Sequence, residues 1–301
     1  MNPLAGESDL LVYSDAARNP AKQAAVDEVR SYLKTITGFR SVTVKHRPEN
    51  YGLAKSIIQG VTEVMAEKQR IIVLEDDMLT SPHFLTYMNE ALDKYADDNR
   101  VVSIHGYAYP VNQLLPESFF LPGADCWGWG TWRRGWKHFN PDGRYLFDSL
   151  RRRKLMRTFD FNGAYPFSEM LEDQIDGRND SWAIRWYASA LLADKLTLYP
   201  GRSLVCNIGH DGSGTHCGTT TIMDTVLSAT PISLANIAVE PSLEGWQAFA
   251  RFLRQGQSGP QRLVRRILSP DQLRSIRALA RDWTPPAMSR WIRSIVDGNK
   301  G

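Results

Sequence analysis

The chain of 301 residues has little cysteine and no long apolar segment. Its three cysteines, Cys126, Cys206 and Cys217, follow no repeating spacing and include no Cys-x-x-Cys pair, which argues against a disulfide framework and a structural zinc site. No stretch approaches the roughly 18 apolar residues that span a bilayer, and the N-terminus lacks the pattern of a secretory signal. We therefore expect a cytoplasmic protein, at most peripheral to the inner face of the membrane.

Two common nucleotide-site signatures are also missing. The segment closest to a phosphate-binding P-loop, residues 52–56, lacks the GxxxxGK[ST] spacing, which argues against nucleotide hydrolysis of that type. A nucleotidyltransferase that makes sugar nucleotides would normally begin with a basic, glycine-rich loop, and none is present. The spacing of His210 and His216 matches no standard zinc site.

The net charge of +3 hides an uneven distribution. Residues 251–301 carry eleven basic and three acidic side chains, a net charge of +8, which leaves −5 for the preceding 250 residues. With 43% hydrophobic and 23% charged residues, the chain can bury a sizeable core, so disordered and fibrous classes are excluded.

Short apolar segments and amphipathic helical patterns alternate through residues 1–110. Strands are expected at 10–13, 42–44, 71–74, 101–104 and 196–199, and helices at 21–33, after the turn at 48–52, after Thr80-Ser81-Pro82 and at 182–192. The alternation predicts an α/β fold with a mostly parallel sheet covered by helices.

Three consecutive acids, Glu75, Asp76 and Asp77, follow the apolar run 71–74. Ligands of open α/β sheets bind outside the carboxyl ends of the strands. Because adjacent carboxylates repel one another, a cation such as Mg²⁺ or Mn²⁺, shared with substrate phosphates, would hold them together. Solvated loop acids are the alternative, and the triplet alone leaves both interpretations open.

Three segments together resemble the GT-A-fold nucleotide-sugar glycosyltransferases: NYGLAKSIIQGV at 50–61, IIVLEDDMLTSPHFLTYMNEAL at 71–92, and the Trp-rich segment that follows. The likeness spans about residues 9–220 and is nearest to bacterial proteins of the N-acetylglucosaminyltransferase I-like and family 2-like group, in which Glu-Asp-Asp is a form of the DxD motif. It implies a GT-A-type, Rossmann-like mixed sheet flanked by helices, with a helical C-terminal appendage. It also implies metal-dependent, inverting transfer of a hexosyl or N-acetylhexosaminyl group from a UDP-linked sugar to a glycan or lipid-linked acceptor, as in polysaccharide biosynthesis.

The resemblance assigns roles to individual residues. Contacts with the nucleotide sugar are expected from Asp15, Asn50, Lys55, Glu75, Asp76, Gly128 and Trp129. Asp77 would ligate Mn²⁺ or Mg²⁺, which neutralises the leaving diphosphate, and His210 in the glycine-rich loop 207–218 would complete the metal site. For Asp15, Asn50 and Lys55, ordinary turn formers and a solvated lysine are the alternatives.

The segment 125–136 holds four tryptophans and three glycines. Tryptophan faces stack on sugar rings and glycine lets backbone approach a ligand, so Gly128 and Trp129 are expected to line the donor-sugar pocket, with a core cluster as the alternative.

Inverting transfer needs a carboxylate to accept the acceptor's proton. Asp180 resembles the family's base, and Glu172 and Asp173 are the alternates. An N-cap of the helix at 182–192 is the other interpretation of Asp180.

We expect three parts: a nucleotide-sugar-binding half (1–110), an acceptor and catalytic half (111–235) and a basic helical tail (236–301). Helices in 251–293 fit peripheral membrane contact, although packing on the domain is favoured, and no motif indicates nucleic acid. The likeness starts at the family's second strand–helix unit. A catalytically inactive sugar- or nucleotide-binding relative is therefore the alternative function.

Overall fold

A computed structural model of the chain describes residues 2–209, 221–255 and 272. The strands in this part are β1 (Asp9–Ser14), β2 (Ser41–His46), β3 (Arg70–Val73), β4 (Met78–Thr80), β5 (Val101–His105), β6 (Ser118–Pro122), β7 (Trp129–Trp132), β8 (Leu196–Pro200) and β9 (Val205–Asn207). The α-helices are α1 (Gln23–Leu33), α2 (Gly52–Glu67), α3 (Phe84–Lys94), α4 (Arg133–Trp136), α5 (Gly143–Arg152), α6 (Met156–Phe159), α7 (Phe167–Ile175), α8 (Trp182–Leu192) and α9 (Leu243–Gln255). The expected α/β class is confirmed.

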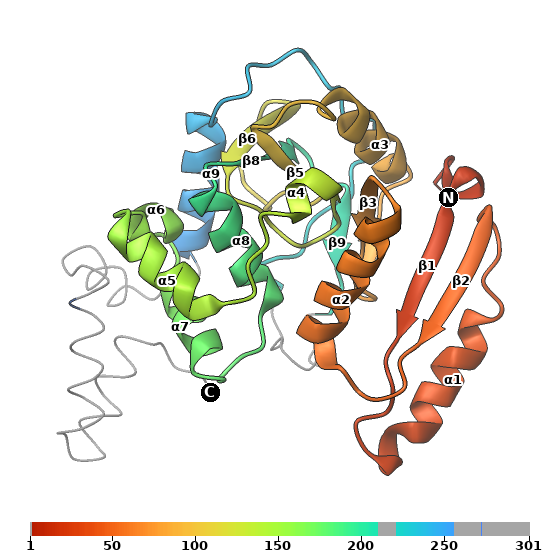
Figure 1. The fold of residues 1–301 in the computed structure, drawn as a ribbon. Helices are drawn as coiled ribbons and strands as arrows, with labels where there is room; N and C mark the ends of the chain where they lie inside the picture. Colours follow the sequence, from red (N-terminus) through yellow and green to blue (C-terminus); the bar gives the residue numbers. More distant parts are fainter. Residues whose placement is uncertain (1, 210–220, 256–271, 273–301) are drawn as a thin grey trace.

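The central sheet has five strands in the order β3-β7-β5-β8-β6. β5 and β8 are parallel, whereas the other neighbouring pairs are antiparallel. Strands β3, β5 and β8 therefore run in one direction and β6 and β7 in the other, which makes the sheet mixed. β1 and β2 form a separate parallel pair beside α1, and β4 pairs with β9 (Figure 1).

Helices cover both faces of the central sheet (Figure 1). On one face lies α3, whose Met88 approaches β7 at Gly130, where a Cβ would lie 2.9 Å from the Met88 Cε. On the other face α2, α4 and α8 pack around Trp129 of β7. The absence of a side chain at Gly130 thus lets α3 approach the sheet closely.

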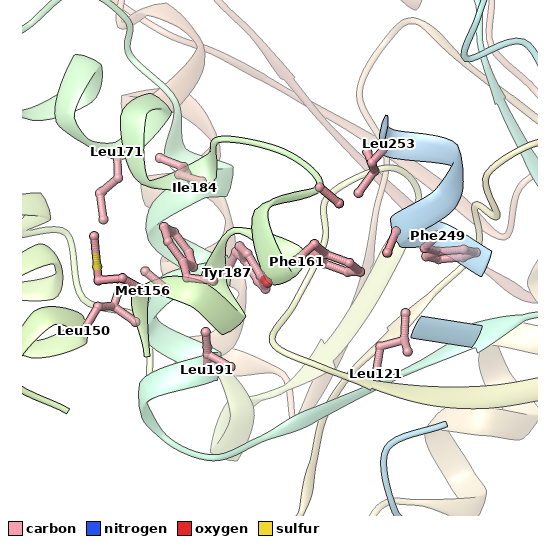
Figure 2. Close-up of a cluster of buried hydrophobic side chains, with 14 of the residues drawn as sticks. Leu121, Leu150, Met156, Phe161, Leu171, Ile184, Tyr187, Leu191, Phe249 and Leu253 are labelled. Carbon is pink, nitrogen blue, oxygen red and sulfur yellow. The ribbon is translucent and has the colours of Figure 1, made fainter. Parts of the chain in front are cut away.

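A third apolar cluster joins α5, α7, α8 and α9 to β6, and Figure 2 shows ten of its residues labelled. Phe249 and Leu253 of α9 are buried in this cluster, near Phe161 and Leu121. The described helix of the expected basic tail is therefore part of the core, as favoured for its apolar side. Residues 256–271 and 273–301 lie outside the described part of the chain.

The helix expected after Thr80-Ser81-Pro82 is present as α3, which begins at Phe84. These three residues do not cap it, because Thr80 ends β4, which pairs with β9, and the N-cap is His83. The Ser81 hydroxyl accepts a hydrogen bond from the His83 N–H (3.2 Å) in the turn between β4 and α3. The helix α1 is present, but it has no fully buried residue.

Candidate active site

The acidic triplet forms the turn between β3 and β4. The Met78 N–H donates to the Glu75 carbonyl (3.3 Å), and the Ile208 N–H donates to the Asp77 carbonyl (2.8 Å). Gly209 lies so close to Asp77 that a Cβ on this glycine would be 2.4 Å from Oδ2. Pairing of β4 with β9 thus brings the end of the described segment, Gly209, against the Asp77 carboxylate.

Glu75 points toward the start of α8, where the Trp182 indole Nε1–H donates to Glu75 Oε1 at 3.3 Å. Burial, together with the smaller effects of the nearby charges of Asp77 and Asp76, raises the pKa of Glu75 to about 7, against the opposing effect of the Trp182 hydrogen bond. The turn therefore holds more negative charge than its surroundings accommodate, a condition that a bound cation would relieve.

The backbone beside the triplet is shaped by Gly128. Its φ is +63°, and a Cβ would lie 2.5 Å from Val205 Cγ2 and 3.4 Å from Leu74 Cδ2. A side chain at this position would collide with β9, so the glycine permits the close packing of β3, β7 and β9 at the triplet.

His105 and Cys126 near this turn were not anticipated from the sequence. His105 ends β5, is fully buried, and its Nε2 accepts the Trp127 N–H (3.1 Å); burial lowers its pKa. Burial also raises the pKa of the Cys126 thiol, and the charges of Asp125, Glu75 and Asp77 add to this effect. The imidazole is therefore neutral and positions the 125–128 segment, and the thiol stays protonated and unreactive. The sequence offered one signal for His105, namely a histidine directly after the apolar strand pattern at 101–104.

Asp15 and Asn50 are brought together at the start of α2. The Asp15 carboxylate accepts the backbone N–H groups of Ala16, Tyr51 and Gly52 (2.8–2.9 Å) and the Asn50 Nδ2–H (3.1 Å). Both side chains thus form the turn that orients α2, which matches their alternative role as turn formers.

Lys55 lies close by, on the first turn of α2. Its ammonium pairs with Glu49 (3.1 Å) and lies 3.7 Å from the centre of the Tyr51 ring. The helix α2 packs against β3 and α8, so it connects this group of residues to the triplet.

Trp129 lies in the core rather than at the surface. It is 0% exposed, and its ring contacts those of Trp136, Trp182 and Trp186 with centroid distances of 5.4–5.9 Å. Because it is fully buried among other tryptophans, this side chain has no surface to offer a sugar, and the core alternative describes it. Gly128 remains adjacent to the triplet.

The cap of α8 is Ser181, whose hydroxyl accepts the Ile184 N–H (3.2 Å). The carboxylate of Asp180 is exposed and lies 3.7 Å from the buried Arg185 guanidinium. The N-cap alternative for Asp180 is therefore wrong. Asp180 lies two residues before Trp182, the first residue of α8, whose indole contacts Glu75.

The alternates lie on α7. Asp173 pairs with Arg178 (2.5 Å), which also pairs with Asp176 (2.6 Å), and Glu172 is partly buried. His210 lies outside the described residues. Within residues 2–209 and 221–255, no three His, Cys, Asp or Glu side chains are grouped to hold a metal. The helices of that part include none that is long and apolar enough to cross a membrane.

Comparison with known families points to one activity. Residues 19–161 match the family model for glycosyl transferase family 2. The matched region, slightly less than half of the chain, contains Asn50, Lys55, the triplet, Gly128 and Trp129, whereas Asp15 and Asp180 lie outside it. The match supports sugar transfer from a nucleotide-sugar donor to an acceptor, and the mixed α/β architecture agrees with the GT-A fold of these enzymes. No curated protein matches the chain.

Proposed function

We propose that this protein transfers a hexosyl or N-acetylhexosaminyl group from a UDP-linked sugar, with inversion, to a glycan or lipid-linked acceptor. The observation that carries the proposal is the acidic turn Glu75–Asp77 at the carboxyl end of β3, linked to α8 by Trp182. Match and geometry agree here, because the triplet lies inside the region that resembles glycosyl transferase family 2.

The donor's diphosphate is expected at this turn. The residues fit a Mn²⁺ or Mg²⁺ ion, because their oxygen donors suit these cations and three carboxyl groups lie together in one turn. Such an ion takes one or two carboxylates and completes its coordination with phosphates and water. Asp77 would ligate the ion and Asp76 would contact the ribose or the water shell of the ion, which when bound stabilises the charge on the leaving diphosphate.

The protein's own groups supply the remaining roles. Asp15 and Asn50 fix the turn before α2, beside which the nucleoside is proposed to lie. Gly128 leaves room for close backbone packing near the sugar. The exposed Asp180 carboxylate would accept the proton from the acceptor hydroxyl as its oxygen attacks the anomeric carbon.

The deciding experiment measures release of nucleoside diphosphate from a panel of sugar nucleotides, together with calorimetric titration of UDP with and without Mn²⁺. We expect Mn²⁺-dependent binding that Asp77→Ala abolishes. The exposed carboxylate of Asp97 offers a matched control, and Asp97→Asn should bind as the wild type does. Binding that is independent of Mn²⁺ or untouched by Asp77→Ala would contradict the proposal.

One outcome supports the alternative function. Mn²⁺-dependent UDP binding without diphosphate release from any donor, with a panel of glycan acceptors present, indicates a sugar- or nucleotide-binding relative without catalysis.

A further inference from the structure

A pocket of about 490 Å³ opens between the end of α4, α5 and the C-terminal end of α8. Its lining includes four basic side chains, Lys137, His138, Arg152 and Arg153. Hydroxyl groups of Tyr145 and Ser149 also line it, and none of its described lining residues is acidic. Basic and hydroxyl groups without a carboxylate are the composition of an anion-binding site.

The basic groups of the pocket are not neutralised by the protein. Arg152 donates to the Ser149 hydroxyl (2.8 Å) and Arg153 donates to the Leu192 carbonyl, so both bind uncharged acceptors. Among the described residues, no carboxylate forms an ion pair with Lys137, His138, Arg152 or Arg153. The positive charge of the pocket therefore remains available to a ligand.

The surrounding sequence strengthens this positive potential. Residues 133–157 contain nine lysines and arginines against two acids, Asp142 and Asp148, a net charge of +7. Asp142 is already engaged, because its carboxylate caps α5 by accepting the Tyr145 N–H (2.9 Å). The pKa of His138 is lowered first by burial and then by the positive charges of Lys195 and Arg134. These two charges therefore add to the positive electrostatic potential around the pocket.

The pocket is separate from the candidate active site. Trp182, which contacts Glu75, begins α8, whereas Leu192 and Ala193, which line the pocket, lie at its other end. Ten helical residues span about 15 Å, so the two places are at opposite ends of one helix. Figure 1 shows α5 beside α8.

We propose that this pocket binds a phosphoryl group. A phosphate monoester or diphosphate carries about two negative charges and several acceptor oxygens, which match the two guanidinium groups, the ammonium and the hydroxyls. The volume accommodates a phosphate or diphosphate with part of its substituent. Binding places negative charge beside His138 and therefore raises the pKa of its imidazole.

The test titrates the full chain with inorganic pyrophosphate in the presence of EDTA, which removes divalent ions from the acidic turn. We expect the double variant Arg152→Gln/Arg153→Gln to bind pyrophosphate at least about tenfold more weakly than the wild type, since each substitution removes a charged hydrogen bond from a guanidinium group to the phosphate. Arg144→Gln is the matched control, because Arg144 is an exposed arginine of α5 outside the pocket. Lys137→Gln, whose side chain makes no internal hydrogen bond among the described residues, should also weaken binding.

Two further measurements complete the design. The imidazole pKa of His138, followed by NMR, should rise when pyrophosphate is added to the wild type and stay unchanged in the double variant. Absence of pyrophosphate binding, or equal binding by the double variant and by Arg144→Gln, overturns the proposal. No sugar donor is used, so this result is independent of the proposed transfer.

The source of the phosphoryl group is distinguished by flotation with phosphatidylcholine vesicles with and without phosphatidic acid. Flotation of the wild type and of Arg144→Gln, but not of the double variant, with phosphatidic acid vesicles identifies a lipid headgroup. Pyrophosphate binding without a difference in flotation between these variants identifies a free phosphoryl compound. Both outcomes support the pocket.

Discussion

The indole Nε1 of Trp182 lies 3.3 Å from Glu75 Oε1, which joins the first residue of α8 to the acidic turn after β3. Trp182 also packs against Trp129 of the central sheet. The turn is thus held from the side of the core, while Asp76 is exposed. Glu75 and Asp77 are partly buried, and the pKa of Glu75 is raised to about 7.

The raised pKa of Glu75 predicts a pH-dependent stability. The folded chain holds the Glu75 proton up to about pH 7, whereas the unfolded chain releases it near pH 4.3. The folded state therefore binds more protons between these values, and the free energy of unfolding falls as the pH rises through this window, by up to about 3 kcal/mol.

Glu75→Gln keeps the acceptor for Trp182 and removes this titration. In EDTA, urea denaturation should show the variant equal to the wild type near pH 4.5 and more stable by up to about 3 kcal/mol at pH 8. The Asp97→Asn control should follow the wild-type curve. Parallel pH profiles for Glu75→Gln and the wild type would show that the carboxyl group is ionised when folded.

A second prediction concerns Asp15, which accepts four hydrogen bonds at the start of α2. Asp15→Ala should lower the free energy of unfolding by about 1–3 kcal/mol, because several backbone donors lose a charged acceptor. Asp27→Ala, an exposed change on α1, should cost less than about 0.5 kcal/mol in the same denaturation experiment. Unchanged stability with weakened UDP binding would instead assign Asp15 chiefly to the nucleoside.

A third prediction compares two glycines with positive φ. Gly128 (φ +63°) has Val205 Cγ2 2.5 Å from its ideal Cβ, whereas Gly177 (φ +70°) has open space there. Both alanine variants lose about 1 kcal/mol to the left-handed backbone, and Gly128→Ala should lose about 1–3 kcal/mol more to overpacking. Equal losses in chemical denaturation would mean that β9 moves away from Gly128 without strain.

The sequence predicted the alternating strands and helices of residues 1–110 except β4, because apolar periodicity depends on local pattern, but it predicted none of the elements between residues 111 and 175. The helix 182–192 agrees with α8 at both ends, and the strand 71–74 differs from β3 by one residue. The strands β4, β6, β7 and β9 were missed. The pairing of β4 with β9 joins residues more than 120 positions apart and leaves no local signal.

Side-chain roles were harder to predict than elements. Trp129 and the other tryptophans have the same composition signature whether they stack on a sugar or on one another, and only the packing of α8 on the sheet distinguishes these cases. The contact of His105 with the 125–128 segment is recognisable only when β5 and that segment are placed side by side. The acidic triplet was predictable because three adjacent carboxylates directly follow an apolar strand pattern, and ligands of α/β sheets bind at the carboxyl ends of strands.

The last prediction separates catalysis from capping at the start of α8. Ser181 caps the helix, while the exposed Asp180 lies 3.7 Å from Arg185 and makes no cap. Asp180→Asn should therefore lower kcat by about 10²- to 10⁴-fold as expected for loss of a general base, with the free energy of unfolding nearly unchanged. Ser181→Ala should lower that free energy by about 1 kcal/mol and keep kcat.

Asp173→Asn, which breaks the exposed pair with Arg178, is the control and should retain activity. Loss of activity in Asp173→Asn but not in Asp180→Asn would transfer the role of base to α7, and the diphosphate-release assay run beside denaturation measures both quantities on the same samples.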